Sequence, residues 1–255
     1  MREGARLTKS TSGEPNFALM KRYQRLLGSL MYVTLQTRPD TMFPIGQLMR
    51  YASNPDDSHM RELIHLLRFF RPTIDKGIVF QALPEDENEE DEDIRRFKRL
   101  GVIQGYVDAD FGGDVDTRRS ATGYIFTLAQ GPISWISKLQ STVSLSTCEA
   151  EYTAISIAGR EALWLASMLE SMEFGGVRPM KIFTDSEPAL KLANNAQKHS
   201  RSKHIDIRVH WIRDAIQKGD IELQYISTDE MIADALTKAL LKVKFDQHAK
   251  AMGVE

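Results

Sequence analysis

The spacing of apolar residues along the chain changes near Gly101. Before this point, apolar residues recur every three or four positions and predict three helices, separated by breaks at Arg38–Asp40 and Asn54–Asp56. After it, short apolar runs predict strands at 102–109, 121–129, 133–137, 180–184 and 221–227. Helical spacing returns at 147–172, 187–194, 205–218 and 229–240. This order predicts an α/β fold with a mixed five-stranded sheet flanked by helices.

The same patterns divide the chain into five segments. We expect a disordered tail at 1–15, a small helical region at 16–82, an acidic loop at 83–99, the α/β domain at 100–241 and a C-terminal tail at 242–255. Within the helical region, Gly77–Gln81 is expected to form a short strand.

The charge of the chain is unevenly distributed. The formal net charge is −2, but eight of the nine residues from Glu85 to Asp93 are acidic. With these eight left out, 33 basic residues face 27 acidic ones. A basic body interrupted by an acidic loop makes a nucleic-acid partner plausible.

Cysteine usage and hydropathy indicate the compartment. The single cysteine, Cys148, excludes a disulfide framework and a cysteine-based zinc site. The N-terminus lacks the apolar segment of a secretory signal, and no apolar run reaches the length of a membrane span. We therefore expect a protein of a reducing compartment that is neither secreted nor held in a membrane.

The longest predicted helix begins with two glutamates that have different explanations. Ser146 and Glu149 have the spacing of a capping box, in which each side chain satisfies a backbone N–H at the helix start. Glu151 instead shares a helix face with small apolar residues, where a carboxylate is costly unless a positive group lies opposite. The helix dipole offers an alternative reason for Glu151.

Three further carboxylates lie at the ends of predicted strands or near the start of a predicted helix. Asp108 and Asp185 end predicted strands, and Asp234 lies one turn into the last predicted helix, away from its apolar side. Ligands collect at strand ends in such sheets, and oxygen ligands without cysteine or histidine suit Mg²⁺ or Mn²⁺. Two such ions can support hydrolysis of a phosphodiester. Taken singly, the two strand-end aspartates can equally be turn residues, and Asp234 can be a solvated helix residue.

A basic cluster lies between the third and fourth of these acids. From Lys191 to Arg213 there are six Lys or Arg and three His, against one acidic residue, Asp206. Such a cluster suits a phosphate backbone, although exposed helix faces also carry such charges. The candidates for contacting nucleic acid are Lys198, Arg201, Lys203, His204 and Arg208.

Several motifs resemble one known family. They are GYVDADFGG at 105–113, RSATGY at 119–124, ISWISKLQ at 133–140, STCEAEY at 146–152, TDS at 184–186, KHID at 203–206 and ADALTK at 233–238. Together and in this order they resemble the ribonuclease H domain of copia-type LTR retrotransposon polyproteins. Earlier runs, LGSLMY at 27–32 and TRPD at 37–40, resemble the connector that joins the polymerase to that domain.

This resemblance implies a ribonuclease-H-like fold and cleavage of the RNA strand of RNA–DNA hybrids. It assigns catalysis and the binding of two Mg²⁺ or Mn²⁺ ions to Asp108, Glu151, Asp185 and Asp234. The motif residues Arg119 and Ser186 become further candidates for nucleic-acid contact. The implied partner is the polymerase part of the same polyprotein, and the implied location is a cytoplasmic retrotransposon particle or the nucleus. The polymerase motif Tyr-x-Asp-Asp is absent from this chain, and no catalytic histidine is assigned.

Two alternatives remain open. An integrase or transposase of the same superfamily is expected to have its glutamate last among the acids, whereas here Glu151 comes second. An inactive nucleic-acid-binding relic of a polyprotein would keep the fold without the activity. The presence of all four acids argues against the relic.

Overall fold

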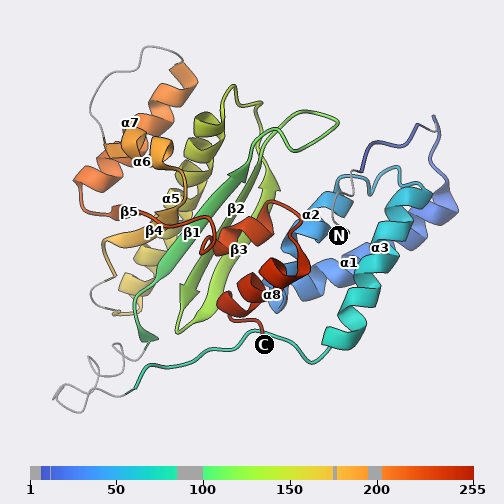
Figure 1. Ribbon diagram of the computed structural model, residues 1–255, viewed down its shortest axis with the longest axis horizontal. Coiled ribbons are helices and arrows are strands. Elements are labelled where there is room, and N and C mark those ends of the chain that lie inside the picture. The colour runs from blue at the N-terminus through green and yellow to red at the C-terminus, as the bar shows by residue number, and fades with distance from the viewer. Residues whose placement is uncertain (1–6, 12, 85–99, 175–176, 195–202) are drawn as a thin grey trace.

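The computed structural model describes residues 7–11, 13–84, 100–174, 177–194 and 203–255, with side chains of the last range described from His210 onward. A group of N-terminal helices lies beside a five-stranded sheet that has helices on both of its faces (Figure 1). Within the described residues, no helix is both long and apolar enough to cross a membrane.

The sheet is mixed, as the sequence predicts. Its strands are β1 (Gln104–Asp110), β2 (Ala121–Leu128), β3 (Gly131–Leu139), β4 (Met180–Thr184) and β5 (Ile221–Tyr225). Their order is β3-β2-β1-β4-β5, with β1, β2 and β3 antiparallel and with β4 and β5 parallel to β1. The predicted five-stranded α/β fold is therefore confirmed.

One face of the sheet is covered by three helices; the first lies behind the strands in Figure 1, and the other two lie at the upper left, near β5. They are α5 (Thr147–Ser171), α6 (Glu187–Asn194) and α7 (Lys203–Gln217). Val107 and Phe126 of the sheet belong to one buried cluster with Ala154, Ile155 and Ala158 of α5. Because alanine side chains are short, α5 packs close to the strands and holds its N-terminal turns next to the end of β1.

The opposite face carries η3 (Ile232–Leu236) and α8 (Lys242–Ala251), drawn in red in front of the sheet in Figure 1. Ile125 of β2 packs there against Leu236 and Met252. Gly123, the partner of Asp108 in the β1–β2 register, makes this approach possible. A Cβ atom on Gly123 would lie 2.8 Å from side-chain atoms of Leu236 and Thr237. Because Gly123 has no side chain, η3 can lie directly over Asp108.

The N-terminal helices form a second core that is joined to the sheet. The elements are α1 (Phe17–Gln36), η1 (Pro39–Thr41), α2 (Met42–Met49), α3 (Asp57–Phe70) and η2 (Arg71–Thr73). Met42 belongs to the same buried cluster as Ile125 and Leu236. Arg50 forms an ion pair with Asp114 at 2.8 Å. The helical region therefore packs directly on the α/β domain.

The two expected tails differ from the structure. Leu7 is buried, and its carbonyl accepts a hydrogen bond of 2.8 Å from the Tyr51 hydroxyl, so residues 7–11 pack on the helices instead of forming a disordered tail. Residues 242–255 contain α8 and end in a bridge between Val254 and Ile78. The segment Gly77–Gln81, expected to be a strand, forms this one bridge, and the N–H groups of Gly77, Val79 and Gln81 donate further backbone hydrogen bonds. Most of the expected acidic loop, residues 85–99, lies outside the described residues.

Candidate active site

Three aspartates from three separate elements converge on one point. Asp108 lies in β1, Asp185 directly follows β4, and Asp234 lies in η3. One carboxylate oxygen from each lies within 4.8 Å of the others. The strand ends place the first two because β1 and β4 are parallel neighbours. Asp234 is 1% exposed in η3, so the alternative that it is a solvated helix residue is wrong.

The pKa of the Asp108 carboxyl group is raised above its ordinary value. Asp108 is 2% exposed, and its pKa is raised to about 6, chiefly by burial and also by the negative charges of Asp234 and Asp185, while Lys238 lowers it. The Thr237 hydroxyl donates a short hydrogen bond to the Asp108 carboxylate, which favours the ionised form. Thr237 therefore fixes the rotamer of Asp108 with respect to η3.

Glu151 faces the same cluster from α5. Its pKa is raised to about 9, chiefly by burial and then by the charges of Asp108 and Asp185, while Lys238 and the Ala109 backbone N–H act in the opposite direction. Its Oε2 atom is buried, with no hydrogen-bond partner in the described part of the chain. A buried carboxylate oxygen without a partner, in the field of other carboxylates, is costly unless a cation joins them.

Glu149 plays the capping role predicted for it. The Ser146 hydroxyl accepts a hydrogen bond of 3.1 Å from the Glu149 N–H. The Glu149 carboxylate accepts one of 2.7 Å from the Leu145 N–H, one residue earlier than an ordinary capping box. The neighbouring glutamates therefore have separate surroundings: Glu149 caps the helix start, and Glu151 is buried near Asp108 and Asp185.

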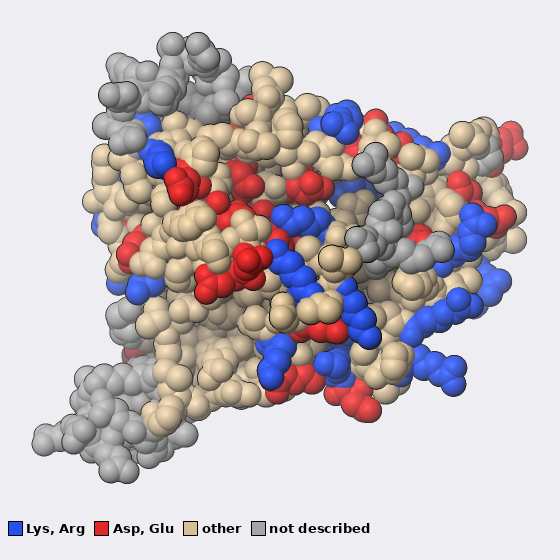
Figure 2. Space-filling view, in the orientation of Figure 1, with Lys and Arg blue, Asp and Glu red and all other residues tan. Residues whose placement is uncertain are grey.

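Two lysines that the sequence analysis did not single out also reach the cluster. The Lys238 Nζ lies 2.8 Å from Asp234 Oδ1 and 3.7 Å from Asp108 Oδ2. Although burial lowers it, the charges of Asp108 and Asp234 raise the pKa of Lys238 above its ordinary range. The Lys244 Nζ lies 3.1 Å from Asp234 Oδ2. On the face that carries η3 and α8, acidic and basic side chains lie next to one another (Figure 2).

The candidates for nucleic-acid contact are only partly described. Ser186 accepts a hydrogen bond of 3.4 Å from the Ala189 N–H at the start of α6, and it lies next to Asp185. Arg119 is half-buried, in the loop between β1 and β2. Lys198 and Arg201 lie outside the described residues; Lys203, His204 and Arg208 belong to α7, in a stretch whose side chains are not described. Their contact with a substrate stays a prediction.

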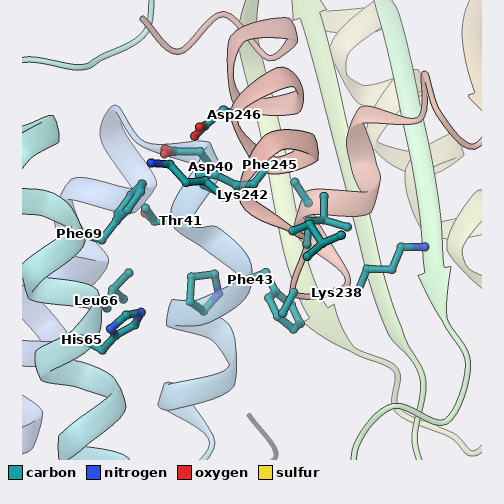
Figure 3. A pocket seen from close by; sticks show the side chains of 15 residues that line it. Asp40, Thr41, Phe43, His65, Leu66, Phe69, Lys238, Lys242, Phe245 and Asp246 are labelled. Carbon is teal, nitrogen blue, oxygen red and sulfur yellow. The ribbon is translucent and has the colours of Figure 1, made fainter. Parts of the chain in front are cut away.

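A pocket of about 350 Å³ separates the carboxylate cluster from the N-terminal helices. Phe43, Phe69 and Phe245 line it, and Lys238 forms part of its wall (Figure 3). The Lys238 amine points away from the pocket, toward the strands (Figure 3). The stem of Lys238 thus covers an apolar wall while its charged end reaches the acids.

The donor set fits a hard divalent cation. The ligand atoms offered are carboxylate oxygens from Asp108, Asp185 and Asp234. Glu151 is not one of these three, but it lies near enough for the charges of Asp108 and Asp185 to raise its pKa. Oxygen-only donors of this kind suit Mg²⁺ or Mn²⁺ better than zinc, which prefers nitrogen and sulfur.

Comparisons with known proteins place the chain in a family. No protein-family model matches it. A retrovirus-related Pol polyprotein from transposon TNT 1-94 of Nicotiana tabacum is 37% identical over 232 residues, covering 91% of this chain and 16% of that protein. Secreted RxLR effector protein 161 of Plasmopara viticola is 39% identical over 145 residues, covering 56% of this chain and 90% of that protein. Among solved structures, LC11 ribonuclease H1 from compost is 15% identical with a TM-score of 0.42, covering 58% of this chain and 98% of that one.

The chain belongs to the Pol polyproteins of copia-type retrotransposons, which confirms the resemblance of its motifs. It spans 16% of the length of the tobacco relative and 15% of the length of two Arabidopsis thaliana relatives.

Proposed function

We propose that this chain is a metal-dependent endonuclease that cleaves the RNA strand of RNA–DNA hybrids, as part of a retrotransposon reverse transcriptase. The observation that carries the proposal is the convergence of Asp108, Asp185 and Asp234 within 4.8 Å. Glu151 faces the same point from α5, and the four acids occupy the positions that the family motifs assign to catalysis. A solvated surface would not bring together acids from a strand, a loop, a short helix and α5.

Asp108, Glu151, Asp185 and Asp234 would hold two divalent cations. When bound, such a pair supplies an activated water and a charge that stabilises the leaving oxygen of a phosphodiester. The protein's own part is to fix the acids in space. Thr237 orients Asp108, and the Thr228 hydroxyl donates a hydrogen bond of 2.8 Å to Asp185.

The rest of the chain would position the hybrid. Its sequence-independent contacts are expected from the basic stretch between Lys191 and Arg213, because phosphate contacts from Lys and Arg carry most of the affinity for nucleic acid. The N-terminal helices, which pack on the sheet through Met42 and Arg50, would join this site to the polymerase part of the polyprotein.

A cleavage assay tests the proposal. Purified chain is incubated with a hybrid labelled in its RNA strand, in Mg²⁺ and in EDTA, beside Asp185→Asn and the matched helix-cap variant Glu149→Gln. The proposal expects cleavage by wild type and Glu149→Gln in Mg²⁺ only, and none by Asp185→Asn. Tight hybrid binding without cleavage in Mg²⁺ or Mn²⁺ would instead identify an inactive nucleic-acid-binding protein.

A further inference from the structure

Each carboxylate oxygen of Asp234 lies close to an ammonium group, Oδ1 at ion-pair distance without a hydrogen bond and Oδ2 with one. Oδ1 lies 2.8 Å from the Lys238 Nζ, and Oδ2 lies 3.1 Å from the Lys244 Nζ. Lys238 reaches on to Asp108 at 3.7 Å, so two positive charges sit among the acids of the cluster. The Asp234 side chain is 1% exposed, while the Lys238 and Lys244 side chains are 39% and 29% exposed, so the buried carboxylate meets both cations at the edge of the solvent.

The two lysines are held by different parts of the fold. Lys238 follows η3 by two residues, and its stem lines the pocket shown in Figure 3. Lys244 comes from α8, and its Nζ also donates a hydrogen bond of 3.1 Å to the Thr228 carbonyl. The Thr228 hydroxyl in turn donates to Asp185 at 2.8 Å. Lys244 is therefore linked to two of the three aspartates.

An ammonium group and a divalent cation compete for the same carboxylate. Both use the oxygen lone pairs, and their charges repel each other at the few ångströms that separate neighbouring groups in this cluster. A cation that takes Asp234 as a ligand must therefore move at least one lysine away from it.

We propose that Lys238 and Lys244 are internal counter-ions of the carboxylate cluster, which hold Asp108 and Asp234 together and set the cation concentration at which the site fills. This inference rests on the proposed role of the four acids as metal ligands. It assigns a role to α8, a segment beyond the family motifs: through Lys244, the C-terminal helix controls the affinity of the site for Mg²⁺.

The direction in which Mg²⁺ affinity changes distinguishes a lysine that competes with the cation from a lysine that only stabilises the fold. If Lys244 competes with the cation, Lys244→Gln should bind Mg²⁺ roughly tenfold more tightly, as expected for one unit charge a few ångströms from a dication. The variant should also melt at a lower temperature in EDTA, and its deficit should shrink at saturating Mg²⁺. A lysine that only supports the fold would leave Mg²⁺ affinity unchanged or weaken it.

Calorimetric titration of the full chain with MgCl₂, together with melting curves, measures both quantities. Lys244→Arg keeps the charge and should resemble wild type, as should Lys242→Gln, which removes an exposed charge two residues away on the same helix. Lys238→Gln serves as a second test should Lys244→Gln not fold, with the same expected tightening.

The outcomes separate this inference from the proposed function. Wild type that binds Mg²⁺ through Asp185, with no tightening in Lys244→Gln or Lys238→Gln, overturns the counter-ion role alone. Mg²⁺ binding that appears only in the two lysine variants supports the counter-ion role. Absence of Mg²⁺ binding in wild type and in both lysine variants removes the metal site and the inference with it.

Discussion

Replacing Glu151 by glutamine should stabilise the protein in EDTA while abolishing cleavage. The Glu151 pKa is raised from 4.5 to about 9, so the folded chain binds a proton that the unfolded chain has released. Stability therefore falls as pH rises between these two values, and the full stability is present only below the lower one. Glutamine is neutral in both states and removes this pH dependence.

The size of the expected stability gain follows from the same pKa shift of Glu151. Each pH unit above 4.5 costs the wild type about 1.4 kcal/mol, or about 3 kcal/mol at pH 7. The glutamine side chain of the variant would still bury one amide atom where Oε2 has no partner, which takes back about 1 kcal/mol. We therefore expect Glu151→Gln to gain about 2 kcal/mol at pH 7, or roughly 4–8 °C in Tm.

Urea unfolding in EDTA at pH 5 and pH 8 measures this gain. The difference between Glu151→Gln and wild type should be small at pH 5 and should grow toward pH 8. Glu149→Gln is the matched control, since its side chain can still accept the Leu145 N–H and lies at the helix cap. A Glu151→Gln protein that is no more stable than wild type at pH 8, or whose advantage is the same at both pH values, would refute the reasoning.

Three further predictions concern other parts of the structure. Asp185→Asn should lose most of the rise in Tm that Mg²⁺ gives wild type, because that rise depends on cation affinity; melting curves with and without MgCl₂ measure it. Arg50→Met should lower the free energy of unfolding by about 1–3 kcal/mol in urea titrations, because Asp114, 5% exposed, loses its ion-pair partner and keeps only the hydrogen bonds from Thr117. Neutralising Lys198 together with Arg201 should raise KM more than it lowers kcat, and should reduce the slope of log affinity against log salt by about 0.7–0.9 per lost phosphate contact. An unchanged slope, measured in Ca²⁺, would place the hybrid elsewhere.

The sheet and α5 could be predicted because their signals are local. The start of α5 is marked by Ser146 and Glu149, and the predicted and observed helices differ by one residue at the end. Asp108 and Asp185 were found because strand ends meet at one edge of a sheet. Whether these acids and Glu151 bind metal stays a prediction, since their position alone does not test it.

The packing of the C-terminal segment could not be predicted, because it depends on contacts between residues that are far apart in sequence. Helix α8 has few apolar residues, and the segment 242–255 is held by Met252 and Val254 in a cluster with Ile125, far away in sequence. Lys244 meets Asp234 only because α8 folds back over η3. The ion pair between Lys238 and Asp234 did have a signal in the sequence, because the two residues are four positions apart, which is the spacing of a helical ion pair.

Strand-selective cleavage tests the central claim most directly. Three duplexes of one sequence, an RNA–DNA hybrid, a DNA duplex and an RNA duplex, are labelled in each strand in turn and incubated with wild type or Asp108→Asn in Mg²⁺. We expect wild type to cut only the RNA strand of the hybrid and Asp108→Asn to cut nothing. Intact RNA in the wild-type hybrid reaction, or equal cutting by Asp108→Asn, would contradict the assignment of these carboxylates to a ribonuclease H site.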